Sequence, residues 1–445
     1  MRTPLSGWGR YPVGISEVHR PERLGELKVP LQSSGSAIAR GLGRSYGDAS
    51  FNSSGCTVLT ERLNRFLDFD PSTGALECEA GVTIGEILEY FIPRGFVPPV
   101  IPGTKFVTLG GALACDIHGK NHHKDGSFGR HVIDFSLLTA DGELVHCSRD
   151  ENVELFRATV GGMGLTGIIT QLRLRLIPIE DPRVVVDYDR AKDLDRALEL
   201  FHESDERYKY SVAWIDCVGG GRRGLGRSVL MRGNPATGSE AAVLRPEKRR
   251  GISVPSTAPS FLLNRGSIRA FNGLYYRKHP RQARGVLSGY ESFFFPLDGI
   301  RNWNRLYGRS GFFQYQAVLP YDDGRDGLVK MLELLRKSGP GAFLAVLKRF
   351  GSGNPEAPLS FPMPGYTLAA DVPRRGSAVL DLLSRLDEIV IDLGGRVYLA
   401  KDARTSPGAV RAMYPHLESW LEIKSRFDPA NRLGSDLARR LELLP

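Results

Sequence analysis

The chain has 445 residues, of which 41% are hydrophobic and 24% are charged, and its formal net charge is +9. This length exceeds the size at which one hydrophobic core usually keeps growing, so we expect at least two domains. The composition is that of a globular protein and excludes disorder over the whole chain. The positive charge favours an anionic partner or surface. Because the chain has no zinc-finger spacing and no aromatic-basic RNA motif, we do not expect nucleic acid to be that partner.

Five cysteines are spread along the chain without a C-x-x-C pair, at Cys56, Cys78, Cys115, Cys147 and Cys217. Their odd number and wide spacing predict reduced thiols rather than a zinc site or a disulfide framework. The first residues lack the apolar core of a signal peptide, and no apolar run reaches the roughly 18 residues that a spanning helix needs. We therefore expect a soluble or peripheral protein with neither a signal peptide nor a transmembrane helix.

The first informative segment is rich in glycine and follows the apolar residues 37–39. It reads Arg40-Gly41-Leu42-Gly43-Arg44-Ser45-Tyr46-Gly47-Asp48. Glycines let backbone N–H groups close around a pyrophosphate, and the arginines add positive charge. A Rossmann loop would lead straight into a helix, whereas residues 49–55 have no helical pattern. The segment favours a phosphate-binding loop outside a Rossmann fold, although an ordinary glycine-rich turn has the same composition.

Two capping boxes predict helices in this half of the chain. Thr83-x-x-Glu86 opens the first, which has an apolar face made of Ile84, Ile87, Leu88 and Phe91. Pro93 and Gly95 end it. Ser148-x-x-Glu151 opens the second, which carries Val153 and Phe156. Residues 172–176 alternate leucine with arginine and predict a strand, and Pro178 marks its exit.

A denser segment combines glycines with polar side chains. It contains Pro102-Gly103-Thr104, Thr108-Leu109-Gly110-Gly111-Ala112 and Cys115-Asp116-Ile117-His118-Gly119-Lys120-Asn121-His122-His123. Small residues beside a polar cluster are what a flat ring system pressed against the backbone requires. The histidines lack a further donor at metal-site spacing, so we expect no metal. We expect His118 to face a pocket and His122 and His123 to form an exposed loop pair.

From about residue 181 the chain is richer in aromatic residues and has strand-like stretches such as 312–319, which predict a second domain. Residues 234–270 combine Pro, Ser and Gly with a basic cluster, Arg245, Lys248, Arg249 and Arg250, followed by Phe261, Leu262 and Leu263. We expect a mobile loop there. Two interpretations of it stay open: a disordered surface insertion, and a basic-apolar flap that rests on anionic lipid.

These segments, together with Val160-Gly161-Gly162-Met163-Gly164-Leu165-Thr166-Gly167-Ile168-Ile169, resemble the FAD-binding domain of the vanillyl-alcohol-oxidase flavoprotein family. The resemblance implies that the first loop holds the pyrophosphate of FAD. It also implies that the later glycine-rich stretches contact the ribityl chain, the adenine and the isoalloxazine. Some members attach FAD through a histidine in the first loop. This chain has Arg44 and Ser45 there, which implies non-covalent FAD.

The C-terminal part narrows the resemblance. Residues 395–404 and 435–444 are similar to those of the oxidase subunits of decaprenylphosphoryl-β-D-ribose epimerases, and the likeness extends over nearly the full chain. In that family the flavin removes hydride from C2 of the ribose of a polyprenyl-phosphate sugar. A partner reductase then converts the keto intermediate to the arabinose epimer for cell-wall arabinan. The resemblance implies an FAD-dependent oxidoreductase that acts on CH–OH groups at the periphery of the cytoplasmic membrane.

The same resemblance implies roles for individual residues. The catalytic residues would be Lys401, His118 and Tyr398. The FAD contacts would be Arg40, Gly41, Leu42, Gly43, Arg44, Ser45, Tyr46, Gly47, Gly103, Thr108, Gly110, Gly111, Cys115, Asp116, His118, Gly164, Ile169, Tyr398 and Lys401. The substrate contacts would be Lys120, Gln314, Gln316, Lys348, Phe350, Thr367 and Ala369. An ammonium such as that of Lys401 would stabilise the anion that develops as the flavin ring accepts hydride.

The chain departs from this family at three positions. Ala369 stands where the best-known members carry a pocket cysteine, so a thiol-reactive inhibitor of that subgroup should not bond here. Thr367 replaces an asparagine and Phe294 replaces a tyrosine, which leaves the sugar contacts open. Two other functions are compatible with the sequence: a soluble sugar, alditol or aldonolactone oxidase, and a non-catalytic prenyl-phosphate-binding protein.

The expected fold is α+β, with two domains. A PCMH-type FAD-binding domain would combine residues 1–180 with residues 396–445. An antiparallel-sheet substrate-binding domain would comprise residues 181–395 and would include the mobile loop over 234–270.

Overall fold

The short β-rich runs of the N-terminal half form two sheets in a computed structural model, which describes residues 2–33, 35–219, 224–237, 252–259, 263–337 and 341–444. The first sheet has the strand order β1-β2-β4-β3, built from Arg2–Ser6, Val13–His19, Cys56–Leu59 and Ala37–Arg40. Strands β2 and β3 pair in parallel with β4. The glycine-rich loop therefore leaves the sheet at the carboxyl end of β3, beside the equivalent end of β4.

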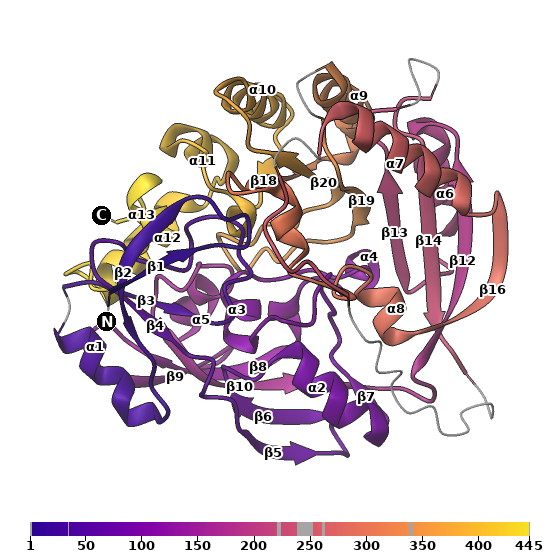
Figure 1. The fold of residues 1–445 in the computed structure, drawn as a ribbon. Helices are drawn as coiled ribbons and strands as arrows, with labels where there is room; N and C mark the ends of the chain where they lie inside the picture. The colour runs from indigo at the N-terminus through magenta and orange to yellow at the C-terminus, as the bar shows by residue number, and fades with distance from the viewer. Residues whose placement is uncertain are drawn as a thin grey trace.

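The second sheet is antiparallel, and its strand order is β5-β6-β10-β8-β9. These strands are Phe66–Asp70, Ala75–Glu79, Ile168–Arg175, Val132–Leu138 and Leu144–Ser148. A two-stranded sheet joins β7 (Phe96–Val97) to β11 (Ile177–Pro178). The helices of this half are α1 (Lys28–Ser33), α2 (Ile84–Phe91), α3 (Leu109–Ala114), α4 (His122–Asp125) and α5 (Val153–Thr159). Figure 1 shows the first sheet on the left of the molecule and the second sheet at the bottom.

The second half builds an eight-stranded sheet in which every pair is antiparallel. Its order is β16-β12-β14-β13-β19-β20-β18-β21, built from Gln282–Gly289, Arg183–Ala191, Ser228–Pro235, Tyr210–Ile215, Ala345–Phe350, Gly365–Pro373, Phe312–Leu319 and Arg396–Val397. A short parallel pair joins β15 (Ile252–Ser253) to β17 (Ile300–Arg301). The expected α+β fold with an antiparallel second sheet is confirmed.

Helices cover one face of the eight-stranded sheet. The apolar faces of α6 (Leu194–Ser204), α9 (Tyr321–Lys337) and α10 (Ala378–Asp392) share one core with the alternate strand residues Ala213, Leu347 and Leu368. The opposite face contacts the N-terminal half, α8 (Tyr290–Phe294) and α7 (Arg265–Lys278). Because neighbouring strand residues point to opposite faces, one strand can serve both the core and a site.

The C-terminal helices return to the N-terminal half, as Figure 1 shows in yellow beside β1 and β2. They are α11 (Pro407–Met413), α12 (Leu417–Phe427) and α13 (Asp436–Arg440). Trp420 of α12 is fully buried and donates from Nε1 to the carbonyl of Ala158 at 2.9 Å. Arg440 of α13 binds Asp48, the last residue of the glycine-rich loop. The division into residues 1–180 plus 396–445 and residues 181–395 stays a prediction, and β21 pairs with β18 of the eight-stranded sheet.

Two helix predictions have different outcomes. The capping box of Thr83 and Glu86 is present and opens α2, with Ile84 and Phe91 among its buried residues. The second capping box is wrong, because Ser148 ends β9 and its hydroxyl accepts the N–H of Glu151 in a turn. The helix α5 begins at Val153, after Asn152, which has a left-handed φ of 49°. A serine that caps a tight turn after a strand has the same spacing as one that caps a helix.

The loop predicted over 234–270 is too long at both of its ends. Residues 234 and 235 belong to β14, and α7 begins at Arg265. The basic residues Arg245, Lys248, Arg249 and Arg250, with Phe261 and Leu262, lie outside the described residues. Among the helices that the structure describes, none has the length and apolar character needed to cross a membrane.

Candidate active site

Three distant segments of the chain meet at the carboxyl end of β3. The N–H of Tyr46 donates to the carbonyl of Ala400 at 3.0 Å. A Cβ at Gly47 would lie 1.8 Å from the carbonyl oxygen of Asp402, and one at Gly41 would lie 2.2 Å from Oγ1 of Thr108. Only glycine fits at contacts this close. The glycine-rich loop therefore lies directly between α3 and the segment that carries Lys401.

The loop has the properties that a pyrophosphate requires. The backbone N–H groups of residues 42–45 donate to no group among the described residues, and Gly43 has a left-handed φ of 62°. The buried Nε of Arg44 also has no partner there, and its guanidinium lies 4.0 Å from the ring centroid of Trp8. A turn with several free N–H groups beside a cation forms an anion-binding concavity. These residues fit the diphosphate of FAD.

The arginine at the start of the loop is already occupied. The guanidinium of Arg40 donates to the carbonyl of Ser6 at 2.8 Å and to Oγ of Ser50 at 3.1 Å. A Cβ at Gly43 would meet this guanidinium at 2.2 Å. The side chain of Arg40 thus holds the loop through these contacts within the protein. Its predicted contact with FAD stays a prediction.

The glycines of α3 bring its backbone against neighbouring segments. Thr108 caps the helix by accepting the N–H of Gly111, and the N–H of Gly110 donates to the carbonyl of Ala80 at 2.8 Å. At the other end of the helix, the hydroxyl of Tyr398 donates to the carbonyl of Cys115 at 2.7 Å. Burial raises the pKa of the Cys115 thiol to about 11, so this cysteine stays protonated. The contact with Tyr398 fixes the C-terminal segment over the glycine-rich half.

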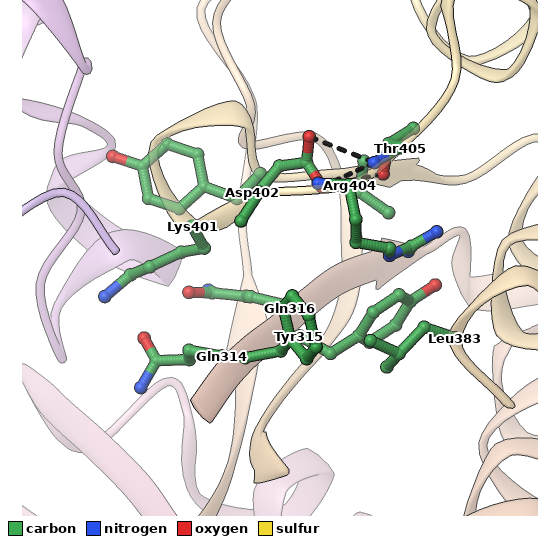
Figure 2. A pocket seen from close by; sticks show the side chains of 12 residues that line it. Gln314, Tyr315, Gln316, Leu383, Lys401, Asp402, Arg404 and Thr405 are labelled. Carbon is green, nitrogen blue, oxygen red and sulfur yellow. Dashed lines mark hydrogen bonds between the residues drawn. The ribbon is translucent and has the colours of Figure 1, made fainter. Parts of the chain in front are cut away.

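One face of the eight-stranded sheet carries the predicted substrate residues. In the strand register Gln314 is opposite Asp371, Gln316 is opposite Ala369, and Thr367 is opposite Lys348. Residues that pair in this way point to the same face. Figure 2 shows the consequence in a pocket lined by β18 and by residues 397–405: Gln314, Gln316 and Lys401 extend to one side, whereas Tyr315 and Arg404 extend to the other.

His118 lies at the centre of a hydrogen-bonded network on this face. Its Nε2 is 2.9 Å from Nε2 of Gln316, and its Nδ1 is 3.0 Å from Nζ of Lys348. The amide nitrogen of Gln316 also donates to Oγ1 of Thr367, which in turn donates to the carbonyl of Ala317. Burial and the charge of Lys348 hold the pKa of His118 well below its usual value. The imidazole is therefore neutral at pH 7.

This network defines the proton positions on His118. An amide nitrogen only donates, so Nε2 of the imidazole accepts the proton of Gln316, and the single imidazole proton resides on Nδ1. Nδ1–H then faces Nζ of Lys348, which accepts a hydrogen bond only as a neutral amine. Burial, followed by the charges of Lys401 and Lys120, lowers the pKa of Lys348 to about 7. This tautomer and the lowered pKa together indicate that Lys348 is a neutral amine once the pH exceeds about 7.

A second network surrounds Lys401. Its ammonium lies 3.9 Å from the ring centroid of Tyr46 in the glycine-rich loop. Burial lowers the pKa of Lys401 to about 8, and the nearby Asp371 opposes that shift. Asp371 is 1% exposed, accepts from Nε2 of Gln314 at 2.6 Å and from the hydroxyl of Tyr307 at 3.2 Å, and has a pKa raised by burial to about 7. The ammonium of Lys401 thus lies against the glycine-rich loop.

Asp371 was missed among the predicted site residues. Its position in the sequence predicts its orientation. Asp371 lies two residues after Ala369 in a strand, so both side chains point to the same face. A buried carboxyl beside a buried ammonium is typical of a functional site.

Several predicted residues have contacts that the sequence did not indicate. His122 is buried, with its ring centroid 4.3 Å from that of Phe350, and Nε2 of His123 contacts the carbonyl of Tyr208, so the exposed pair is wrong. Asp116 accepts hydrogen bonds from Ser127, Gly129 and Ser360. Lys120 donates to the carbonyl of Phe293, and burial lowers its pKa to about 7. Gly103 is exposed, Gly164 lies in the turn before β10, and the buried Ile169 lies in β10.

Comparisons with known proteins identify the family of the chain. The model of an FAD-binding domain family matches residues 27–148, which include both glycine-rich segments. The chain is 38% identical to the decaprenylphosphoryl-β-D-ribose oxidase of Mycolicibacterium smegmatis, over 99% of this chain and 97% of that protein. It is 35% identical to an uncharacterised protein of Streptomyces coelicolor over 81% of this chain and all of that protein.

A more distant relative matches only the N-terminal part. The putative D-arabinono-1,4-lactone oxidase of Neurospora crassa is 26% identical over 38% of this chain and 31% of that protein. The similarity to the M. smegmatis oxidase, by contrast, extends over the eight-stranded sheet and the C-terminal segment. The chain therefore belongs to the decaprenylphosphoryl-β-D-ribose oxidase family of FAD-dependent oxidoreductases.

Proposed function

We propose that the chain oxidises the 2′-hydroxyl of a polyprenylphosphoryl-β-D-ribose to the 2′-keto sugar. The observation that carries this proposal is the neutral His118, held between Gln316 and Lys348 on the face that also presents Lys401. Alcohol oxidation by hydride transfer needs a proton acceptor at the hydroxyl and a hydride acceptor at the carbon. Bound FAD supplies the hydride acceptor.

The proton leaves the hydroxyl through His118. The substrate hydroxyl takes the place of the Gln316 amide at Nε2, and Nε2 accepts its proton. As that bond forms, Nδ1 gives its proton to the amine of Lys348, 3.0 Å away. The imidazole stays neutral throughout, which its burial requires. One proton moves from the substrate to Lys348, and the hydride with its two electrons leaves the same carbinol.

Lys401 has a different role in this proposal. Its ammonium lies beside Tyr46 of the glycine-rich loop and near Asp371, where it stabilises the negative charge that the hydride acceptor gains. Tyr398 holds the backbone of Cys115 and thereby the end of α3. On the same face of the sheet, Nε2 of Gln314 donates a hydrogen bond to the carboxyl of Asp371. Lys401 thus acts on the hydride acceptor, and His118 acts on the hydroxyl of the hydride donor.

Substrate binding follows from the remaining polar and apolar groups. Lys120, next to the rings of Phe293 and Phe294, is the phosphate ligand. Phe350, Thr367 and Ala369 line the sugar side of the sheet. The keto product requires a separate reductase to give the arabinose epimer used in arabinan synthesis. A prenyl tail also requires that the protein work at a membrane surface.

Anaerobic reduction of the FAD-loaded protein tests this function. We expect a polyprenylphosphoryl ribose to bleach the flavin absorbance, and free ribose, alditols and aldonolactones to bleach it far more slowly. Faster bleaching by a free sugar or lactone would assign the chain to the sugar or aldonolactone oxidases instead. Protein that binds FAD and the prenyl phosphate without bleaching would be a binding protein, which contradicts the proposal.

A further inference from the structure

The helix α7 presents an unusual surface. Leu274 is 70% exposed and Phe271 is 44% exposed, and both lie on the outer side of the helix. The exposed charges of α7 are all basic, at Arg265, Arg269, Arg277 and Lys278, and the helix contains no acidic residue. Among the described residues, none of these four cations forms an ion pair with a carboxylate. In helical geometry Arg277 and Lys278 flank Leu274, on the side opposite the buried Ile268, Asn272 and Gly273. The outer side of α7 is therefore both apolar and cationic.

The inner side of α7 holds it firmly on the catalytic face of the eight-stranded sheet. Asn272 is buried and donates to Oδ1 of Asp216 at 2.8 Å. The ring centroid of Tyr275 lies 4.7 Å from that of Trp214 in β13. Figure 1 shows α7 near the ends of β13 and β14, away from the N-terminal half. The exposed residues are thus presented by a fixed helix.

A row of side chains connects the catalytic network to this helix. In the strand register Gln316 is opposite Ala369, Ala369 is opposite Val346, and Val346 is opposite Trp214. Three steps between neighbouring strands cover about 14 Å. Beyond Gln316 the row is apolar, and Ala369 and Val346 are partly exposed. At Trp214 it meets Tyr275, which stacks on Phe271 at 6.2 Å.

We propose that α7 docks the protein on an anionic lipid surface, with Phe271 and Leu274 inserted among the lipids and the basic residues at the headgroups. Exposed apolar side chains beside cations that pair with no carboxylate of the described residues are the pattern of interfacial helices. The row from Gln316 to Trp214 then guides an apolar tail from the site to the membrane. This second step rests on the proposed function, whereas lipid docking by α7 does not.

Vesicle co-sedimentation of the full-length, FAD-loaded protein tests the docking. We expect binding to vesicles of phosphatidylcholine with phosphatidylglycerol and at least tenfold weaker binding to phosphatidylcholine alone. The double variant Phe271→Ser, Leu274→Ser should bind the anionic vesicles at least tenfold more weakly. The double variant Arg277→Gln, Lys278→Gln should lose the preference for anionic vesicles.

Matched controls keep the outcome specific. Leu144 is 58% exposed on β9 and Arg385 is exposed on α10, so Leu144→Ser and Arg385→Gln should bind vesicles as the parent protein does. Parent-like vesicle binding by both α7 variants would overturn the proposal. A parent dimer that binds no vesicles and becomes monomeric in the Leu274→Ser protein would also overturn it, because a second copy would then be the occupant.

The test separates this inference from the proposed function. Flavin reduction by a detergent-dispersed prenylphosphoryl ribose should stay within about twofold of the parent rate in the α7 variants, since the catalytic residues are unchanged. A protein that binds anionic vesicles through α7 but is not reduced by the prenylphosphoryl ribose would support the docking and contradict the function.

Discussion

The glycine-rich loop of residues 40–48, called the cradle below, presents its backbone. The catalytic face of the eight-stranded sheet, which carries Gln316, Lys348 and Asp371, presents side chains. The cradle uses backbone: free N–H groups at residues 42–45 and glycines whose Cβ atoms would collide with Thr108 or Asp402. The catalytic face uses side chains on alternate positions of β18, β19 and β20, held by mutual hydrogen bonds. An added Cβ in the cradle would collide with neighbouring atoms, whereas a side chain on the sheet face can be replaced without moving the backbone.

The difference also appears in the electrostatics. Around His118 the structure gathers Lys120, Lys348 and Lys401, and burial lowers the pKa of each lysine. Such groups change charge near neutral pH and can move protons. The cradle has no titrating group of this kind, and Arg44 stays charged. Substitutions in the cradle should therefore change FAD content, and substitutions on the sheet face should change turnover.

The largest effect on FAD content is expected from Gly47→Ala. The new Cβ would lie 1.8 Å from the carbonyl oxygen of Asp402, and backbone atoms cannot yield as a flexible side chain can. We expect FAD content to fall to about a tenth or less, because overpacking of this kind costs roughly 1–3 kcal/mol. Absorbance at the flavin band per protein measures it. Gly25→Ala, where nothing lies within 4 Å, should keep its FAD.

The second effect is expected from Lys401→Met. The variant should keep FAD but lose turnover by about 10²–10³, since loss of one preorganised charge at a developing anion has this magnitude. Anaerobic single-turnover reduction and flavin content measure the two quantities separately. Full turnover with full FAD content would remove Lys401 from the chemistry.

A third effect concerns pH. The pKa of Lys348 is lowered to about 7, so Lys348 loses its proton as the pH rises through that value and becomes able to accept one. The rate of flavin reduction should therefore rise between about pH 6 and pH 8, and Lys348→Met should abolish this rise with a loss of about 10²-fold.

Asp371 titrates in the same range and provides the control. Its pKa is raised to about 7, so Asp371→Asn removes the second group that changes charge there. If the relay through Lys348 is correct, the Asp371→Asn protein keeps the rise with pH. A flat profile in that variant, with an intact rise in Lys348→Met, would assign the pH dependence to the carboxyl.

The smallest effect on turnover is expected from Ala369→Cys. Ala369 is partly exposed on the catalytic face and makes no polar contact that activity needs. We expect turnover within about threefold of the parent, together with maleimide labelling at least about tenfold faster than that of the native thiols. The native cysteines resist because burial raises the pKa of Cys115 to about 11 and of Cys147 to about 12. Ala370→Cys, one residue on and facing the core, should label slowly.

The sequence by itself determined the features that depend on neighbours within a few residues. The capping box at Thr83, the strand over 312–319 and the glycine-rich loop after β3 all follow from local pattern, because hydrogen bonds and steric limits within one turn decide them. The resemblance in the same segments also identified the family and its cofactor.

Only the tertiary structure decided the rest. The sequence could not show that His122 is buried against Phe350, that Ser148 caps a turn, or that Asp371 lies near Lys401, since these depend on contacts between separate elements of the fold or on competing local partners. It also could not show that α7 lies on the catalytic face with Leu274 outward. Burial and long-range hydrogen bonding set the charge state of Lys348, and no spacing in the sequence encodes it.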